Sequence, residues 1–72
     1  MTNVFVTIDG QLQQRTINGT KVSDLRSLQN FSSGTIHLKG TDGRRTPVND
    51  TAELVFNGEY SIVKTQSTGA NL

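Results

Sequence analysis

The chain has 72 residues, one histidine, no cysteine, and a net charge of +1 from seven basic and six acidic residues. This length predicts one domain with a small core, and the lack of cysteine excludes a disulfide or a thiolate-bound zinc ion that would stabilise it. The charges are interspersed, which argues against a dedicated nucleic-acid or membrane-surface protein. With one histidine and scattered carboxylates, we expect no metal, no cofactor and no enzymatic activity.

The N-terminal residues show no basic stretch followed by an apolar one, and no apolar run approaches the ~20 residues that a membrane span requires. We therefore expect a soluble, cytoplasmic protein with no membrane partner. Residues 1–66 are predicted to form a single domain, and the polar residues 67–72 are predicted to form a flexible C-terminal tail.

Two strands are predicted at the start of the chain. Residues 4–8 alternate between apolar and other side chains, which is typical of a half-buried strand. The side chains expected to face the core are Val4, Val6 and Ile8. Asp9-Gly10 is a preferred hairpin turn pair, and residues 12–17 then return as a polar strand. Its glutamine-rich middle indicates an exposed sheet edge.

One short helix is predicted after this hairpin. Thr20 is a suitable N-cap, and apolar side chains recur at three-residue spacing at Val22, Leu25 and Leu28. Phe31 is a candidate to continue this apolar stripe. We expect two to three helical turns that end at residues 32–34 and pack on one face of a sheet.

Three further strands are predicted at residues 35–39, 44–48 and 60–65. Pro47 cannot donate a hydrogen bond to a neighbouring strand, so the second of these belongs at an edge. The pair Asn57-Gly58 predicts a tight turn that contains a positive φ. Leu54 and Phe56, which precede that turn, are expected to close the open end of the core.

The element order is a hairpin, a helix, two short strands and a final strand. It predicts an α+β fold, in which a mixed sheet of four or five strands has one short helix packed on one face.

Three stretches of the chain resemble the β-grasp, or ubiquitin-like, superfamily. They are V-F-V-T-I-D-G at residues 4–10, V-S-D-L at residues 22–25, and L-V-F-N-G-E-Y-S-I-V at residues 54–63. The small bacterial sulfur carriers and the prokaryotic ubiquitin-like domains are nearest in pattern. The resemblance covers nearly the whole chain and implies the β-grasp fold.

Members of this superfamily that are adenylated at the C-terminus end in Gly-Gly on a flexible tail. This chain departs from that pattern, because one glycine is followed by Ala70, Asn71 and Leu72. A ubiquitin-like modifier or a sulfur carrier would therefore need processing at Gly69. This role is an alternative for the chain's function.

A protein-binding surface is predicted on the sheet face away from the helix. If the helix is faced by Val4, Val6, Ile8, Tyr60 and Ile62, then Phe5 and Val63 face the other way on neighbouring strands. A two-residue turn would place Leu12 beside Thr7 on that same face, whereas a bulged turn would reverse the assignment. Phe5, Leu12 and Val63 would then form an exposed apolar patch for a partner.

A second binding mode is predicted at the polar edge strand. A strand of another protein can add to residues 11–17 through backbone hydrogen bonds, with Gln13 and Arg15 selecting its side chains. The alternative is an edge that is kept polar to prevent such pairing.

Basic residues cluster around the predicted turn at residues 41–43. Lys39, Arg44 and Arg45 can contact phosphates at a hairpin tip, or an anionic protein surface. No aromatic residue is interleaved for base stacking, which makes nucleic acid the less favoured partner. His37 lies nearby but has no evident nucleophile to activate, so we expect it to be a solvated strand residue.

These features favour a small, non-enzymatic protein–protein interaction module that is monomeric or weakly associating. It would act as an adaptor, a subunit or an inhibitor of a larger protein, and would be bacterial or encoded by a phage. A modifier or sulfur carrier, and a nucleic-acid binder acting through residues 39–45, are the alternatives.

Overall fold

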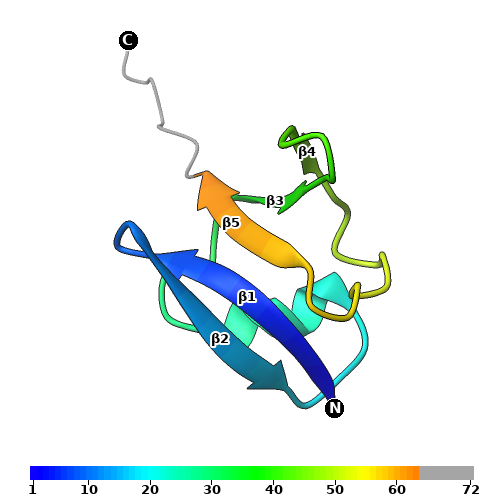
Figure 1. Cartoon of the computed structure of the whole chain (residues 1–72). Coiled ribbons are helices and arrows are strands. Elements are labelled where there is room, and N and C mark those ends of the chain that lie inside the picture. The colour runs from blue at the N-terminus through cyan, green and yellow to red at the C-terminus, as the bar shows by residue number, and fades with distance from the viewer. Residues whose placement is uncertain (64–72) are drawn as a thin grey trace, which may run out of the picture.

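The computed structural model describes residues 1–63, which form a five-stranded sheet with a short helix on one face (Figure 1). The elements are β1 (Thr2–Ile8), β2 (Gln11–Ile17), the 3₁₀ helix η1 (Val22–Ser27), β3 (Thr35–Lys39), β4 (Arg45–Pro47) and β5 (Glu59–Val63). The predicted tail at residues 67–72 and the end of the predicted domain lie outside the described residues. Within residues 1–63, no helix has the length and apolar character needed to cross a membrane.

The strands lie in the order β2-β1-β5-β3-β4. β1 and β5 are parallel in the middle of the sheet, and the other neighbouring pairs are antiparallel. This confirms the predicted mixed sheet with one short helix on one face. β2 and β4 are the edges, as the polar sequence of residues 11–17 and the presence of Pro47 predicted.

The turn between β1 and β2 fixes which side chains face outward. Asp9 and Gly10 both have positive φ, at 53° and 79°, which is the signature of a two-residue type I′ turn. Thr7 consequently lies opposite Leu12 in the ladder. Directly opposed residues point to the same face, so Leu12 faces away from η1, as the prediction for a two-residue turn required.

The helix differs from the predicted one in type, start and length. It is a 3₁₀ helix of six residues, with Lys21 rather than Thr20 at the N-cap. The backbone N–H of Lys21 donates to Asp24 Oδ2 at 3.0 Å, so the acidic side chain of the first turn caps the helix.

The three-residue spacing of Val22 and Leu25 is compatible with the observed helix type. A 3₁₀ helix has three residues per turn and therefore stacks these two side chains directly above each other, both fully buried. Leu28 is already extended, with φ −81° and ψ 153°, so the helix stops after about two 3₁₀ turns and does not reach the predicted end at residues 32–34.

The core lies between η1 and the sheet. Its buried apolar side chains are Val4, Val6, Ile8, Ile17, Val22, Leu25, Phe31, Ile36 and Tyr60. β1 supplies three of them through its period-2 alternation. Phe31, which follows the helix and is fully buried, is the largest of them after Tyr60.

The prediction that Phe56 closes the open end of the core is wrong. Phe56 is 69% exposed, although Leu54 does pack against the core. Tyr60 takes the buried position instead, and its Oη accepts a hydrogen bond from the backbone N–H of Val55 at 2.8 Å. That bond fixes the chain just before the turn, so Phe56 at the turn points to solvent.

The turn before β5 needs two special residues. Asn57, rather than Gly58, carries the positive φ, at 62°. Gly58 is needed for a different reason, because a Cβ there would lie 3.0 Å from both Leu38 Cδ1 and the carbonyl oxygen of Val55. A larger residue at this position would crowd these two groups, so that one of them would have to shift by a few tenths of an ångström.

Replacing Tyr60 by phenylalanine should loosen this turn while leaving the core filled. We expect the free energy of unfolding to fall by about 1 kcal/mol, because the Val55 N–H loses its acceptor. Hydrogen exchange of the Val55 amide should accelerate more than that of amides in β1. Unchanged exchange at Val55 would show that the Tyr60 hydroxyl does not hold the turn.

Candidate binding surface on the sheet

The sheet face opposite η1 is not covered by any other element of residues 1–63 (Figure 1). We call it the outer face. The strand registers assign its members, which are Leu12, Gln14 and Thr16 of β2, Asn3, Phe5 and Thr7 of β1, Glu59, Ser61 and Val63 of β5, Thr35, His37 and Lys39 of β3, and Arg45 and Pro47 of β4.

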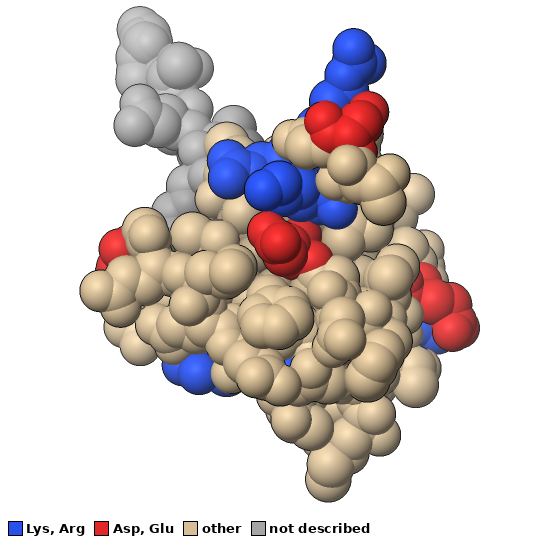
Figure 2. All heavy atoms as spheres, in the orientation of Figure 1, with Lys and Arg blue, Asp and Glu red and all other residues tan. Residues whose placement is uncertain are grey.

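Charge is unevenly distributed over this face. Figure 2 shows basic side chains gathered toward β3 and β4 with an acidic side chain beside them, while the surface over β1 carries no charge. The outer face is therefore uncharged and partly apolar over β1 and carries both basic and acidic side chains toward β3 and β4.

The three predicted apolar contact residues all lie on the outer face. Leu12 is 55% exposed and Val63 is 54% exposed, whereas Phe5 is partly buried. The parallel register of β1 and β5 places the hydroxyl residues Thr7 and Ser61 between them. The structure thus places the three on one face but separates them by polar side chains.

Gln13 and Arg15 lie at the sheet edge but on the side of η1. Their partners in β1 are the buried residues Val6 and Val4, and opposed residues share a face. The Arg15 guanidinium donates to Gln13 Oε1 and, at 3.2 Å, to the carbonyl oxygen of Gln14. Both side chains are therefore bonded within β2, and their role in selecting a partner strand stays a prediction.

A chain of side-chain amides crosses the outer face. Gln14 Nε2 donates to Asn3 Oδ1 at 2.9 Å, and Asn3 Nδ2 donates to Asn57 Oδ1 at 2.7 Å. It joins β2, β1 and the turn before β5. The sequence alone gives no signal for it, because the Asn3–Asn57 contact joins residues far apart in the chain.

Two of the three predicted basic residues lie near carboxylates of the same chain. Lys39 Nζ lies 3.8 Å from Glu59 Oε1, and Arg44 Nε lies 3.8 Å from Asp42 Oδ2 in the β3–β4 loop. Arg45 is on the outer face and has no ion-pair partner within residues 1–63. Two of the three basic side chains are thus partly neutralised, and phosphate binding at this hairpin stays a prediction.

A hollow of about 380 Å³ opens where β1 and β5 separate. The two strands pair only at Phe5 opposite Glu59 and at Val6 opposite Tyr60, so a gap follows beyond these positions. The residues that line the hollow are Thr7, Asp9, Gly10, Asn30, Arg45, Ser61, Ile62 and Val63.

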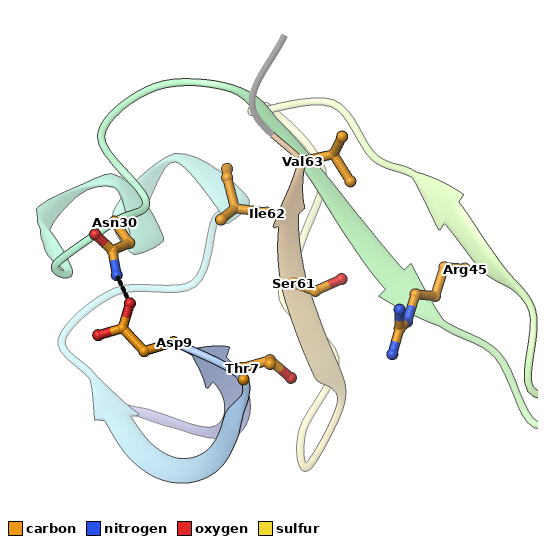
Figure 3. A pocket seen from close by; sticks show the side chains of 8 residues that line it. Thr7, Asp9, Asn30, Arg45, Ser61, Ile62 and Val63 are labelled. Carbon is orange, nitrogen blue, oxygen red and sulfur yellow. Dashed lines mark hydrogen bonds between the residues drawn. The ribbon is translucent and has the colours of Figure 1, made fainter. Parts of the chain in front are cut away.

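The lining residues of the hollow come from both sides of β5 (Figure 3). Ser61 and Arg45 lie on the outer side, whereas Ile62 and Asn30 lie on the side of η1. Asn30 Nδ2 donates to Asp9 Oδ1 at 3.3 Å, so these two side chains bond to each other at the inner end. The outer end presents hydroxyl and guanidinium groups.

The side chains on this face offer hydrogen bonds and apolar contact. Hydroxyl and guanidinium groups are hydrogen-bond donors, and Leu12 and Val63 offer apolar contact. His37 Nδ1 contacts the carbonyl oxygen of Thr35 at 3.2 Å and lies on β3, with no nucleophile placed against it by any described hydrogen bond. In residues 1–63, no three histidine, aspartate or glutamate side chains are grouped so as to hold a metal ion.

The described residues define a small α+β domain with one uncovered sheet face that combines apolar, hydroxyl and basic groups. Comparison of the chain with models of protein families, with curated proteins and with solved structures gave no match.

Proposed function

We propose that the chain is a β-grasp domain that works as a protein–protein interaction module. Two observations support the fold assignment. β1 and β5 are parallel neighbours within the sheet, and η1 lies in the connection between β2 and β3, on one face of the sheet. The resemblance of residues 4–10, 22–25 and 54–63 to that superfamily adds to them.

The domain binds a larger protein through the outer face and acts as an adaptor, a subunit or an inhibitor. The observation that supports this role best is the exposure of Leu12 and Val63 on a sheet face that no described element covers. Apolar side chains on an uncovered sheet face are typical of a protein-binding surface. The role as modifier or sulfur carrier depends on Gly69 and the residues after it, which lie outside the described part of the chain.

The test is capture of partners from an extract by the tagged full-length chain, compared with Leu12→Glu and Val63→Glu. A buried carboxylate at a protein interface is strongly unfavourable, so each variant should lose at least about tenfold in captured partner. Both positions are about half exposed, and the variants should stay folded, which circular dichroism and urea unfolding will check.

Val55→Glu is the matched control. Val55 is also half exposed, but it lies in the loop before β5 rather than on the outer face. It should capture the same partner at the wild-type level. If Val55→Glu loses the partner while Leu12→Glu and Val63→Glu keep it, the loop is the interface and the proposed role of the outer face is wrong.

A further inference from the structure

We infer that the hollow between β1 and β5 binds the carboxylate of an aspartate or glutamate side chain of the protein partner. The inference rests on the proposed function and adds the chemistry of the partner. Arg45 supplies the guanidinium, and the hydroxyls of Thr7 and Ser61 are the further donors at the outer end of the hollow (Figure 3).

Arg45 is the basic side chain best suited to bind a carboxylate of another protein. Lys39 and Arg44 each lie 3.8 Å from a carboxylate of this chain, whereas Arg45 has no ion-pair partner within residues 1–63. It is on β4 and extends along the outer face to line the hollow. A guanidinium presents several donors in a plane and pairs with both oxygens of a carboxylate.

The pleat of β1 and β5 makes Thr7 and Ser61 the other two hydrogen-bond donors of the proposed site. Each follows the paired residues Val6 and Tyr60 by one position, so both point to the outer face on neighbouring strands. In Figure 3, the Thr7 and Ser61 side chains lie on the side of the strands that also carries Arg45. A carboxylate placed among these three groups has donors on more than one side.

Val63 and Leu12 explain why the carboxylate belongs to a protein. Val63 lines the hollow, and Leu12 lies on the outer face opposite Thr7, so apolar contact is available next to the donors. The volume of about 380 Å³ is near the lower end of the range for small-ligand sites, about 300–1,000 Å³. It admits one side chain, with neighbouring residues resting on the apolar surface.

Asp9 disfavours a phosphate in the same place. Its carboxylate lines the hollow, where it adds a negative charge opposite the single guanidinium. A phosphate monoester, as on a phosphorylated side chain, carries up to two negative charges and is repelled more than a carboxylate with one. A phosphorylated side chain is therefore the less suitable occupant, whereas a nucleic-acid phosphodiester carries one charge, as a carboxylate does, and is tested separately below.

The direct test uses two blocked tripeptides with the isotope-labelled full-length chain. Acetyl-Val-Glu-Val-amide should cause saturable chemical-shift changes at the backbone amides of Thr7, Ser61 and Val63. Acetyl-Val-Gln-Val-amide has nearly the same shape without the charge and should bind about fivefold more weakly or worse.

Arg45→Gln and Arg44→Gln form a matched pair of variants. They remove the same charge at adjacent exposed positions, but only Arg45 lines the hollow. Arg45→Gln should weaken binding of the glutamate peptide about fivefold, and Arg44→Gln should change it by less than about twofold. Equal losses in the two variants would overturn the inference, as would equal affinity for the two tripeptides or no saturable shift at the hollow.

Binding of a single-stranded oligothymidylate tests the alternative that the hairpin binds nucleic acid. Binding that weakens steeply with salt and is lost equally in both arginine variants would assign the hairpin to phosphates and overturn the inference. The peptide test is independent of partner capture. If capture depends on Leu12 while the two tripeptides bind alike, the proposed function stands and the carboxylate site is wrong.

Discussion

Replacing Phe31 by alanine is expected to lower the free energy of unfolding by about 3–5 kcal/mol. The Phe31 side chain is fully buried, and it packs in the core where the chain leaves η1 for β3. A chain of this length has a total stability of roughly 4–11 kcal/mol. The variant should therefore unfold at a much lower urea concentration, or be largely unfolded without urea.

Phe56→Ala is the control, because it deletes the same atoms from a side chain that is 69% exposed. Its effect on the free energy of unfolding should stay within about 0.5 kcal/mol. Equal losses in the two variants would contradict the assigned burial of both residues. Urea unfolding followed by circular dichroism measures both variants, and the slope with urea concentration shows whether the unfolded state has changed.

Arg26→Met is expected to lower the free energy of unfolding by about 2–3 kcal/mol, because charged hydrogen bonds to two part-buried carbonyl groups are lost. Arg26 Nη1 donates to the carbonyl oxygens of Phe31 at 3.2 Å and Gly34 at 2.9 Å, and Nη2 lies 2.9 Å from Asp50 Oδ1. The side chain is only 26% exposed. One guanidinium thus joins the helix, the loop after it and the segment before β5.

Two further variants separate hydrogen bonding from charge. Arg26→Lys keeps the charge but has no planar set of donors, so it should recover less than half of the loss. Asp50→Asn removes one partner of a half-exposed ion pair and should cost no more than about 1 kcal/mol. If Asp50→Asn costs as much as Arg26→Met, the ion pair rather than the carbonyl contacts stabilises the loop.

The strands were predictable because their signals are local. The alternation over residues 4–8 predicts a strand because successive side chains of a strand point to opposite faces. The pair Asp9-Gly10 predicts a type I′ turn because these residues adopt positive φ more easily than most. Pro47 likewise places its strand at an edge through its missing N–H. None of these signals depends on the rest of the chain.

The helix type and the closure of the core were not predictable in the same way. Val22 and Leu25 at three-residue spacing fit one face of an α-helix or a 3₁₀ helix, and the length of the helix decides between them. Tyr60 and Phe56 are both aromatic and close in sequence. Alternation predicted Tyr60 on the core side, and the structure confirms it. The exposure of Phe56 had no such signal, because the turn is fixed by the bond from the Val55 N–H to the Tyr60 hydroxyl.

The candidate site was partly predictable. Phe5, Leu12 and Val63 were assigned to one face from alternation, once the turn was taken as two residues long. The hollow had no sequence signal, because Thr7, Ser61 and Arg45 come from three strands. It forms where β1 and β5 stop pairing, which is a property of their register.

The central position of β5 has a consequence for how the chain folds as it is synthesised. β5 lies between β1 and β3, so until residues 59–63 arrive the β1–β2 hairpin and the β3–β4 hairpin share no strand. Isolated hairpins are at best marginally stable in water. Bringing the two ends of residues 1–63 together also requires closing a long loop, which slows folding. The domain should therefore stay unfolded until residues 59–63 have left the ribosome and then fold cooperatively.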